Sequence, residues 1–140
     1  MRWQDVPEPM RVVDASVLVR YLTGDNPVMQ ASAKRLVDSE RPLGLTAVAV
    51  LETAYVLHRV YGHPRAAVVD ALVELVTRRN FVGVGIDRDQ IAAKLLLCRS
   101  SGAVSFGDAL LAATAASAGL DSAYTFDEKL SRAGLIATVP

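Results

Sequence analysis

Four acidic residues of this 140-residue chain lie in or directly after apolar segments, where a solvated surface charge is not expected. Asp14 follows the apolar run of VVD and Asp127 follows AYTF, whereas Glu52 lies in AVAVLETAYVL and Asp108 in SFGDALLAATAA. A carboxylate buried among apolar side chains is unfavourable unless something compensates its charge. Carboxylate oxygens suit Mg²⁺ or Mn²⁺, and no cluster of Cys and His indicates zinc. We therefore predict that these four acids bind a divalent metal ion.

Asp14 and Glu52 also have purely structural explanations. Asp14 stands where a strand gives way to a helix, so its side chain can serve as an N-cap. The helical neighbours of Glu52 one turn away are apolar, which predicts a buried carboxylate, and a buried Arg partner could neutralise it. Both alternatives remain open on the sequence alone.

The last two acids have simpler explanations as well. Ser105-x-x-Asp108 resembles a capping box, although Glu is the usual acid at its last position. Thr125-x-x-Glu128 matches the capping box fully, which predicts that Asp127 is left free. Asp127 can still be an ordinary surface charge. A carboxylate in the first turn of a helix can both cap and bind a metal ion, so the two roles of Asp108 are compatible.

Strand-like and helix-like segments alternate along the chain. Strands are expected at 11–13, 42–45, 81–86, 122–125 and 135–139. Helices are expected from 15, at 27–39 after the cap Asn26, at 46–61, from 64, at 87–100, at 105–119 and at 127–133. This alternation predicts an α/β fold with a parallel sheet covered on both faces. Such sheets bind ligands beyond the carboxyl ends of their strands, which is where Asp14 and Asp127 would lie.

The composition limits the class of protein. Length and a hydrophobic content of 51% predict one domain at 11–140, preceded by a poorly ordered leader at 1–10. The formal net charge is zero, so RNA binding would need a local basic patch. Cys98 is the only cysteine, and we expect it in the core; His58 and His63 are expected at the surface. There is no membrane span or signal sequence in the pattern, and we expect a cytoplasmic protein.

The segments VVDASVLVRYL, LTAVAVLETAYVL, FGDALLAATAASAG and AYTFDEKL resemble the four acidic motifs of PIN domains, in the order of that family. The similarity is closest to the VapC-like toxin ribonucleases of type II toxin–antitoxin systems. It implies a three-layer α/β/α sandwich with a central parallel sheet of four to five strands. It also implies a homodimer, a cognate antitoxin protein as partner, and a structured RNA of the tRNA or rRNA class as substrate.

The resemblance assigns roles to individual residues. Asp14, Glu52 and Asp108 would be the core ligands of Mg²⁺ or Mn²⁺, and Asp127 a further acid. Two hydroxyl residues would support the site, namely Ser16 and Thr125. The implied activity is that of an endoribonuclease in which metal-activated water hydrolyses a phosphodiester bond. Arg20 is our first candidate for RNA binding, with a surface salt bridge as the alternative; Arg59, Arg99 and Arg132 are further candidates.

Three other functions compete with this hypothesis. A non-catalytic PIN-like module could bind RNA or protein without cutting, although all four acids are present. A phosphatase of the haloacid-dehalogenase type would use Asp14 as nucleophile but needs a second Asp where Ser16 stands. A receiver domain would need paired acids before the first strand and a suitably placed lysine. The sequence therefore favours the ribonuclease.

Overall fold

The computed structural model of the protein describes residues 2–6, 9–100 and 102–140. Its strands are β1 (Arg11–Val12), β2 (Leu43–Leu45), β3 (Phe81–Gly83), β4 (Ser122–Tyr124) and β5 (Ile136–Thr138). Its α-helices are α1 (Ala15–Leu22), α2 (Pro27–Val37), α3 (Ala47–Tyr55), α4 (Arg65–Val76), α5 (Arg88–Leu96) and α6 (Phe106–Ser117). Three short helical segments are η1 (Trp3–Asp5), η2 (Val56–Val60) and η3 (Glu128–Ala133). The alternation of strands and helices that the sequence predicts is confirmed.

β1, β2 and β3 form a parallel sheet in that order, with Val12 opposite Gly44 and Gly44 opposite Val82. The central strand β2 is buried along its whole length. A Cβ atom on Gly44 would lie 3.2 Å from the Cα of Val12, so glycine allows β1 to lie close against it. The carboxyl ends of the three strands meet at one edge, from which the chain enters α1 after β1 and α3 after β2.

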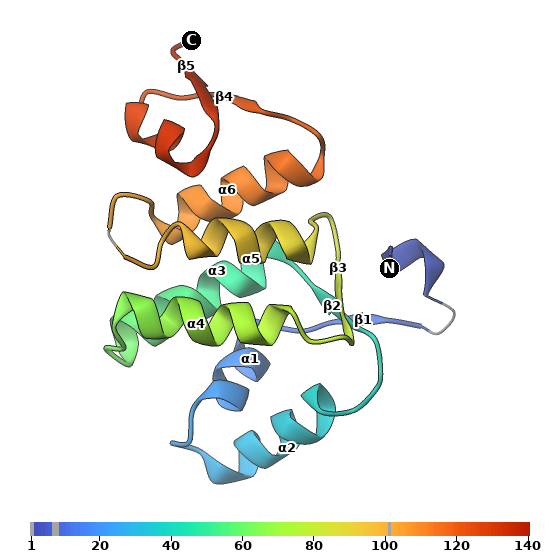
Figure 1. The fold of residues 1–140 in the computed structure, drawn as a ribbon. Helices are drawn as coiled ribbons and strands as arrows, with labels where there is room; N and C mark the ends of the chain where they lie inside the picture. Colours follow the sequence, from blue (N-terminus) through green and yellow to red (C-terminus); the bar gives the residue numbers. More distant parts are fainter. Residues whose placement is uncertain (1, 7–8, 101) are drawn as a thin grey trace.

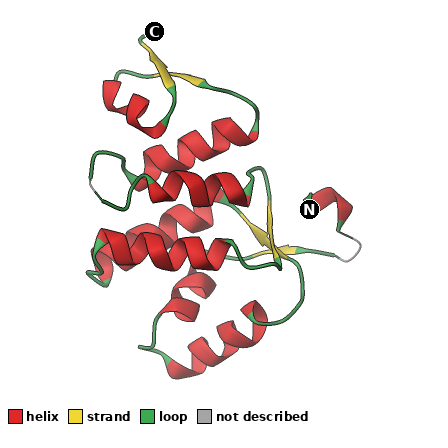
Figure 2. Cartoon of the chain, viewed as in Figure 1, coloured by secondary structure: helices red, strands yellow, loops and turns green. Residues whose placement is uncertain are grey.

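β4 and β5 form a separate parallel pair, in which Ala123 lies opposite Ala137. The pair lies at one end of an elongated molecule, with α5 and α6 between it and the three-stranded sheet (Figures 1 and 2). The predicted parallel α/β class is thus confirmed, but the strands of the described residues are divided between two sheets. The reason is tertiary packing: Leu130, Ala133 and Leu135 pack into the core beside α6 and hold β4 and β5 there.

The predicted helix starts are confirmed by capping side chains. Asn26 accepts a hydrogen bond from the backbone N–H of Met29, and Thr46 accepts one from Ala49. The helix expected over 46–61 continues to Val60, but its last five residues form the π-helix η2 instead of α-helix. It ends before Gly62, whose φ of 72° is a conformation that favours glycine.

The core lies between the helices and the three-stranded sheet. Its largest fully buried side chains include Phe81, Phe106, Leu45 and Leu72. Cys98 is also fully buried, which confirms its predicted place in the core, and burial raises the pKa of its thiol to about 11.

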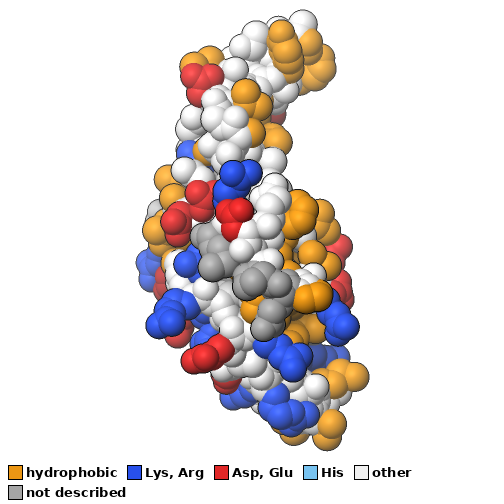
Figure 3. Space-filling model, turned by 90° about the vertical axis from the view of Figure 1, so that its right-hand side faces the viewer, with side chains coloured by type: hydrophobic (Ala, Val, Ile, Leu, Met, Phe, Trp, Pro, Cys, Tyr) orange, Lys and Arg blue, Asp and Glu red, His pale blue; other side chains and the backbone are white. Residues whose placement is uncertain are grey.

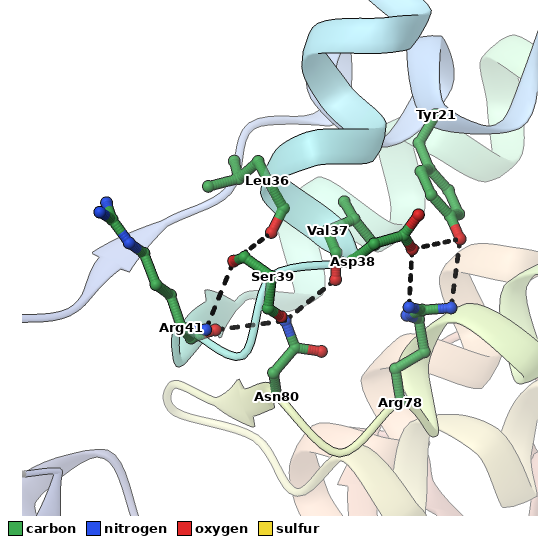
Figure 4. Close-up of polar contacts among 8 residues, drawn as sticks. All are labelled: Tyr21, Leu36, Val37, Asp38, Ser39, Arg41, Arg78 and Asn80. Atoms are coloured by element: carbon green, nitrogen blue, oxygen red, sulfur yellow. Dashed lines mark hydrogen bonds and ion pairs between the residues drawn. The ribbon is translucent and has the colours of Figure 1, made fainter.

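Asn80 and Arg78 join the segment before β3 to the end of α2 (Figure 4). The side-chain amide of Asn80 donates to the carbonyl oxygens of Val37, Ser39 and Arg41, at 3.0–3.2 Å. Arg78 donates to the Asp38 carboxylate at 2.7 Å and to the Tyr21 hydroxyl at 3.2 Å. These contacts tie α1, α2 and the start of β3 into one packed unit.

The leader expected over 1–10 is only partly described. Residues 1, 7 and 8 lie outside the described residues, and Trp3–Asp5 forms the 3-10 turn η1. Of the helices in the described ranges, none combines the length and apolar character that a membrane span requires.

Candidate metal centre

Asp14 stands between β1 and α1, as predicted, and its side chain is exposed. It is the N-cap of α1: the carboxylate oxygen Oδ2 accepts from the Ser16 hydroxyl at 2.6 Å and from the Ser16 backbone N–H at 3.2 Å. The hydroxyl hydrogen bond, followed by the backbone one, lowers the pKa of Asp14 below its usual value. The capping alternative is therefore correct, and it leaves an ionised carboxylate that is still open to solvent.

Glu52 lies in the middle of α3, and its side chain is exposed. The prediction of a buried carboxylate was wrong. The buried face of α3 consists of Ala49, Val50, Thr53 and Ala54, and Glu52 lies beside that face. Its apolar neighbours Val48 and Tyr55 are themselves exposed, at 66% and 38%, so an apolar neighbourhood in sequence did not mean burial. Among the residues that the structure describes, neither a buried Arg nor another basic side chain pairs with Glu52.

Asp108 lies in the first turn of α6 and is half-buried. The Ser105 hydroxyl accepts from the Asp108 backbone N–H at 3.0 Å, which is one half of the expected capping box. The Asp108 carboxylate is not engaged by that cap. The start of α6 faces α3, because the Phe106 ring meets the Tyr55 ring edge-on at 6.3 Å.

Asp127 follows β4, but its place differs from the prediction in two respects. Its carboxylate caps η3 by accepting from the Lys129 backbone N–H at 2.9 Å, whereas Thr125 accepts from the Asp127 backbone N–H at 2.9 Å. The expected capping box between Thr125 and Glu128 was therefore wrong, and Asp127 is not free. Because β4 pairs with β5 and not with β1, Asp127 also does not lie at the sheet edge that carries Asp14.

The three other acids come from elements that pack together. α1 packs against α3, and α3 packs against α6, so Asp14, Glu52 and Asp108 belong to one contiguous group of helices. Within the residues that the structure describes, however, no three Asp, Glu, His or Cys side chains are close enough to hold a metal ion. Convergence of all four acids on one ion thus stays a prediction.

Ion pairs with arginine engage three other surface acids but none of the four predicted ligands in the described chain. Arg20, Arg78 and Arg99 neutralise Asp25, Asp38 and Asp70 respectively, at 2.7–3.0 Å. No ion pair with Lys or Arg involves Asp14, Glu52, Asp108 or Asp127 in the described chain. Carboxylates that keep their charge uncompensated and accessible are a suitable donor set for a hard divalent cation.

The predicted RNA-binding residue Arg20 forms the surface salt bridge that was its alternative, with Asp25 at 3.0 Å. Two other arginines lie against aromatic rings of α3 and α6, the helices that carry Glu52 and Asp108. The Arg59 guanidinium lies 5.2 Å from the centre of the Tyr55 ring, and that of Arg65 lies 4.6 Å from the Phe106 ring. Arg65 was not among the predicted residues, because its position depends on how the start of α4 packs against the start of α6.

The histidines are placed nearly as expected. His63 is exposed, and His58 is half-buried with its ring 5.9 Å from the Phe106 ring. The Nδ1 atom of His58 lies 2.9 Å from the His63 carbonyl oxygen. Neither histidine belongs to a group of metal-binding side chains in the described residues.

Comparison with known proteins gives concordant matches. The model of the family described as the PIN domain matches residues 11–135. The chain is 36% identical over 110 residues to the 23S rRNA-specific endonuclease VapC20 of Mycobacterium tuberculosis, in strains CDC 1551 / Oshkosh and ATCC 25618 / H37Rv alike. Each match covers 78% of this chain and 83% of the relative.

Proposed function

The chain belongs to the PIN-domain family, and on that premise we propose that it is a metal-dependent endoribonuclease, the toxin of a toxin–antitoxin pair. The observation that carries the proposal is the family match over residues 11–135, which includes all four acids. The relative from Mycobacterium tuberculosis is named for cleavage of 23S rRNA, so ribosomal RNA is the first substrate to test.

Asp14, Glu52 and Asp108 would hold Mg²⁺ or Mn²⁺, and Asp127 would complete the site. When bound, the ion would make hydroxide available from water near neutral pH and neutralise charge on the scissile phosphate. Ser16 holds the Asp14 carboxylate in one orientation and favours its ionised form, so Asp14 is ready to accept a cation at neutral pH. The Thr125 hydroxyl accepts from the backbone N–H of Asp127 and so positions that acid indirectly.

RNA would be held by cations and aromatic rings beside the acids. Arg59 and Tyr55 form an exposed cation–aromatic pair three to seven residues after Glu52. An exposed ring can stack on an unpaired base and a guanidinium can bind phosphate. Arg20 can contribute where phosphate competes with Asp25 for its guanidinium. Because the net charge of the chain is zero, RNA binding requires a local basic patch, and these arginines would provide one.

The test is cleavage of 23S rRNA and of tRNA by the purified chain, with and without EDTA, Mg²⁺ or Mn²⁺. We expect EDTA to abolish cleavage and either ion to restore it. Asp14→Asn and Asp108→Asn should each lower the cleavage rate by about 100-fold or more, because loss of a ligand should exceed the effect of losing an outer-shell partner. Growth arrest on expression should be relieved by the same variants.

Asp89→Asn and Glu40→Gln are matched controls, because both acids are exposed and lie outside the proposed site. Both should cleave like the unmodified chain. Cleavage that survives in Asp14→Asn or Asp108→Asn, with a folded protein by circular dichroism, would refute the assignment of these ligands. Co-expression with the gene product of the neighbouring reading frame should suppress cleavage if that product is the cognate antitoxin.

A non-catalytic binding module remains the second candidate. It is favoured by one observation: the described residues contain no group of three metal-binding side chains. Such a module would bind RNA or a protein without needing Mn²⁺. Titration with Mn²⁺ separates the two, since the nuclease should bind the ion through Asp14 and Asp108 whereas the module should not.

A further inference from the structure

Both outer strands of each sheet have a free edge in the described part of the chain, and β1 and β4 are the outer strands that lead directly to Asp14 and Asp127. β1 pairs only with β2, and β4 pairs only with β5. The free N–H and C=O groups of such an edge are a template for a further strand. Every strand pair of the described residues is parallel, and a parallel pairing of β4 with β1 would join all five strands into one continuous parallel sheet.

Exposed apolar side chains accompany both edges. Val12 of β1 and Val48 of α3 are exposed at 63% and 66%, and Tyr124 of β4 and Ile136 of β5 at 80% and 61%. Figure 3 shows hydrophobic side chains grouped at the middle of one face and again at the end that carries β4 and β5. Contact between the two edges would remove these side chains from water, which favours pairing.

The β4–β5 pair is held away from its own β1. Leu130 and Ala133 of η3, together with Leu135, are 0–5% exposed and belong to the main core. The Lys94 ammonium also donates to the Ala133 carbonyl oxygen at 3.1 Å. Pairing with β1 of the same chain would withdraw these residues from the core, whereas β1 of a second copy could be reached without that loss.

We propose that two copies of this chain exchange their C-terminal strands: β4 of each copy pairs with β1 of the other and brings its Asp127 beside the Asp14 of that other copy. Asp14 follows β1 by two residues and Asp127 follows β4 by three, so parallel pairing puts both at the same sheet edge. The metal site would then be completed by the partner's Asp127. The role of that site rests on the proposed function; the strand exchange does not.

The exchange closes on itself. Each copy offers one free β1 edge and one free β4 edge, so a reciprocal pair with twofold symmetry uses all four. A one-way exchange would leave an edge at each end and would grow into filaments. A discrete dimer is therefore the expected assembly.

Cross-linking between differently tagged chains tests the exchange without any assay of activity. One chain carries Val12→Cys, and the other carries a cysteine at Ser122, Ala123 or Tyr124, to allow for the unknown register. After co-expression and mild oxidation we expect a covalent product with one chain of each kind for at least one position. Val28→Cys is the control, since Val28 is exposed on α2 and should give no product.

Two outcomes would overturn the exchange. One is a link that forms within a single chain carrying both cysteines, so that the product migrates as a monomer. The other is the absence of any link at all three positions, in variants that retain the circular dichroism and melting temperature of the unmodified chain.

Complementation tests the shared site. In an exchanged dimer, one site of each mixed pair of Asp14→Asn and Asp127→Asn chains keeps all its acids, so co-expression should restore about a quarter of the cleavage rate. Asp14→Asn with Asp108→Asn is the control and should restore none, because both acids come from the same copy. If cross-links form without complementation, the strand exchange is supported but Asp127 does not belong to the metal site. If cross-links form and the unmodified chain does not cleave RNA, the proposed nuclease activity is refuted and the exchange is not.

Discussion

Strands β2 and β3 of the three-stranded sheet have the same length as β4 and β5 but differ from them in burial. Every residue of β2 is buried and Phe81 of β3 is 2% exposed, whereas β4 and β5 keep both of their outer positions exposed. An isolated two-stranded pair is marginal in water, so the β4–β5 pair depends on what it packs against. The anchor is η3 and Leu135, and the strands themselves are left available for a partner.

The difference in burial predicts that truncating a core side chain of β3 destabilises the chain far more than truncating an exposed side chain of β5. Phe81→Ala should lower the free energy of unfolding by about 3–5 kcal/mol, because it leaves a cavity in the core against β3. Ile136→Ala, on the exposed pair, should change it by less than about 1 kcal/mol. Urea unfolding at a protein concentration where the chain is monomeric measures both.

Equal losses of unfolding free energy in Phe81→Ala and Ile136→Ala would contradict this prediction. If Ile136→Ala destabilised the monomer as much as Phe81→Ala does, β5 would have to be packed against its own chain. If the loss of unfolding free energy in Ile136→Ala grows with protein concentration, the result would support the proposed exchange. The reason is that the exposed side chains of the β4–β5 pair would be buried only in the dimer, which forms at high concentration.

The polar ties of the two regions offer a second contrast. Asn80→Ala removes donors from three backbone carbonyls and should cost about 1–3 kcal/mol of unfolding free energy. Lys94→Met removes only the hydrogen bond to the Ala133 carbonyl and should cost about 0.5–1.5 kcal/mol. Arg79→Ala is the control for Asn80, since Arg79 is exposed and forms none of these bonds. Equal losses in Asn80→Ala and Lys94→Met would contradict the ranking.

The sequence predicted local structure better than long-range placement. Caps such as Asn26 and Thr46 are set by neighbouring residues, so they could be identified from spacing, and the alternation of strands and helices followed from hydrophobic periodicity. Which strands pair depends on contacts between distant segments. The anchoring of Leu135 beside α6, which separates Asp127 from Asp14, left no local signal.

The same distinction explains the site. The family motifs identified the acids by type, and Asp14 stands at the end of β1 as expected. The burial of Glu52 was predicted wrongly, because the apolar residues around it are themselves exposed on α3. Exposure is decided by which helix face the rest of the molecule covers, and periodicity over a single helix did not specify that face.

Cys98 gives a pH-dependent test in the core between the two regions. Burial raises the pKa of its thiol from 9.0 to about 11, so the folded chain keeps the thiol protonated where the unfolded chain ionises it. The resulting stabilisation is present below pH 9 and is lost as the pH rises towards 11. Unfolding free energies of the unmodified chain and Cys98→Ala, compared between pH 8 and pH 10.5, should show a steeper fall in the unmodified chain. A parallel decline in both would contradict the contribution of Cys98.

The two hydroxyl residues of the proposed site, Ser16 and Thr125, should differ in their effect on the pKa of Asp14. Ser16 donates to the Asp14 carboxylate, so Ser16→Ala should raise the pKa of Asp14 towards 3.8, as followed by NMR titration. The sign of the linkage is that of a lowered carboxyl pKa: its contribution to stability is present above the unfolded pKa and is lost as the pH falls through the folded one. Thr125 contacts the backbone of Asp127, and Thr125→Val should therefore leave the Asp14 titration unchanged. This expectation applies at a protein concentration where the chain is monomeric. A shift of the Asp14 pKa in Thr125→Val under that condition would contradict the separation of the two hydroxyl residues, and Ser16→Ala without a shift would remove the hydrogen bond as the cause.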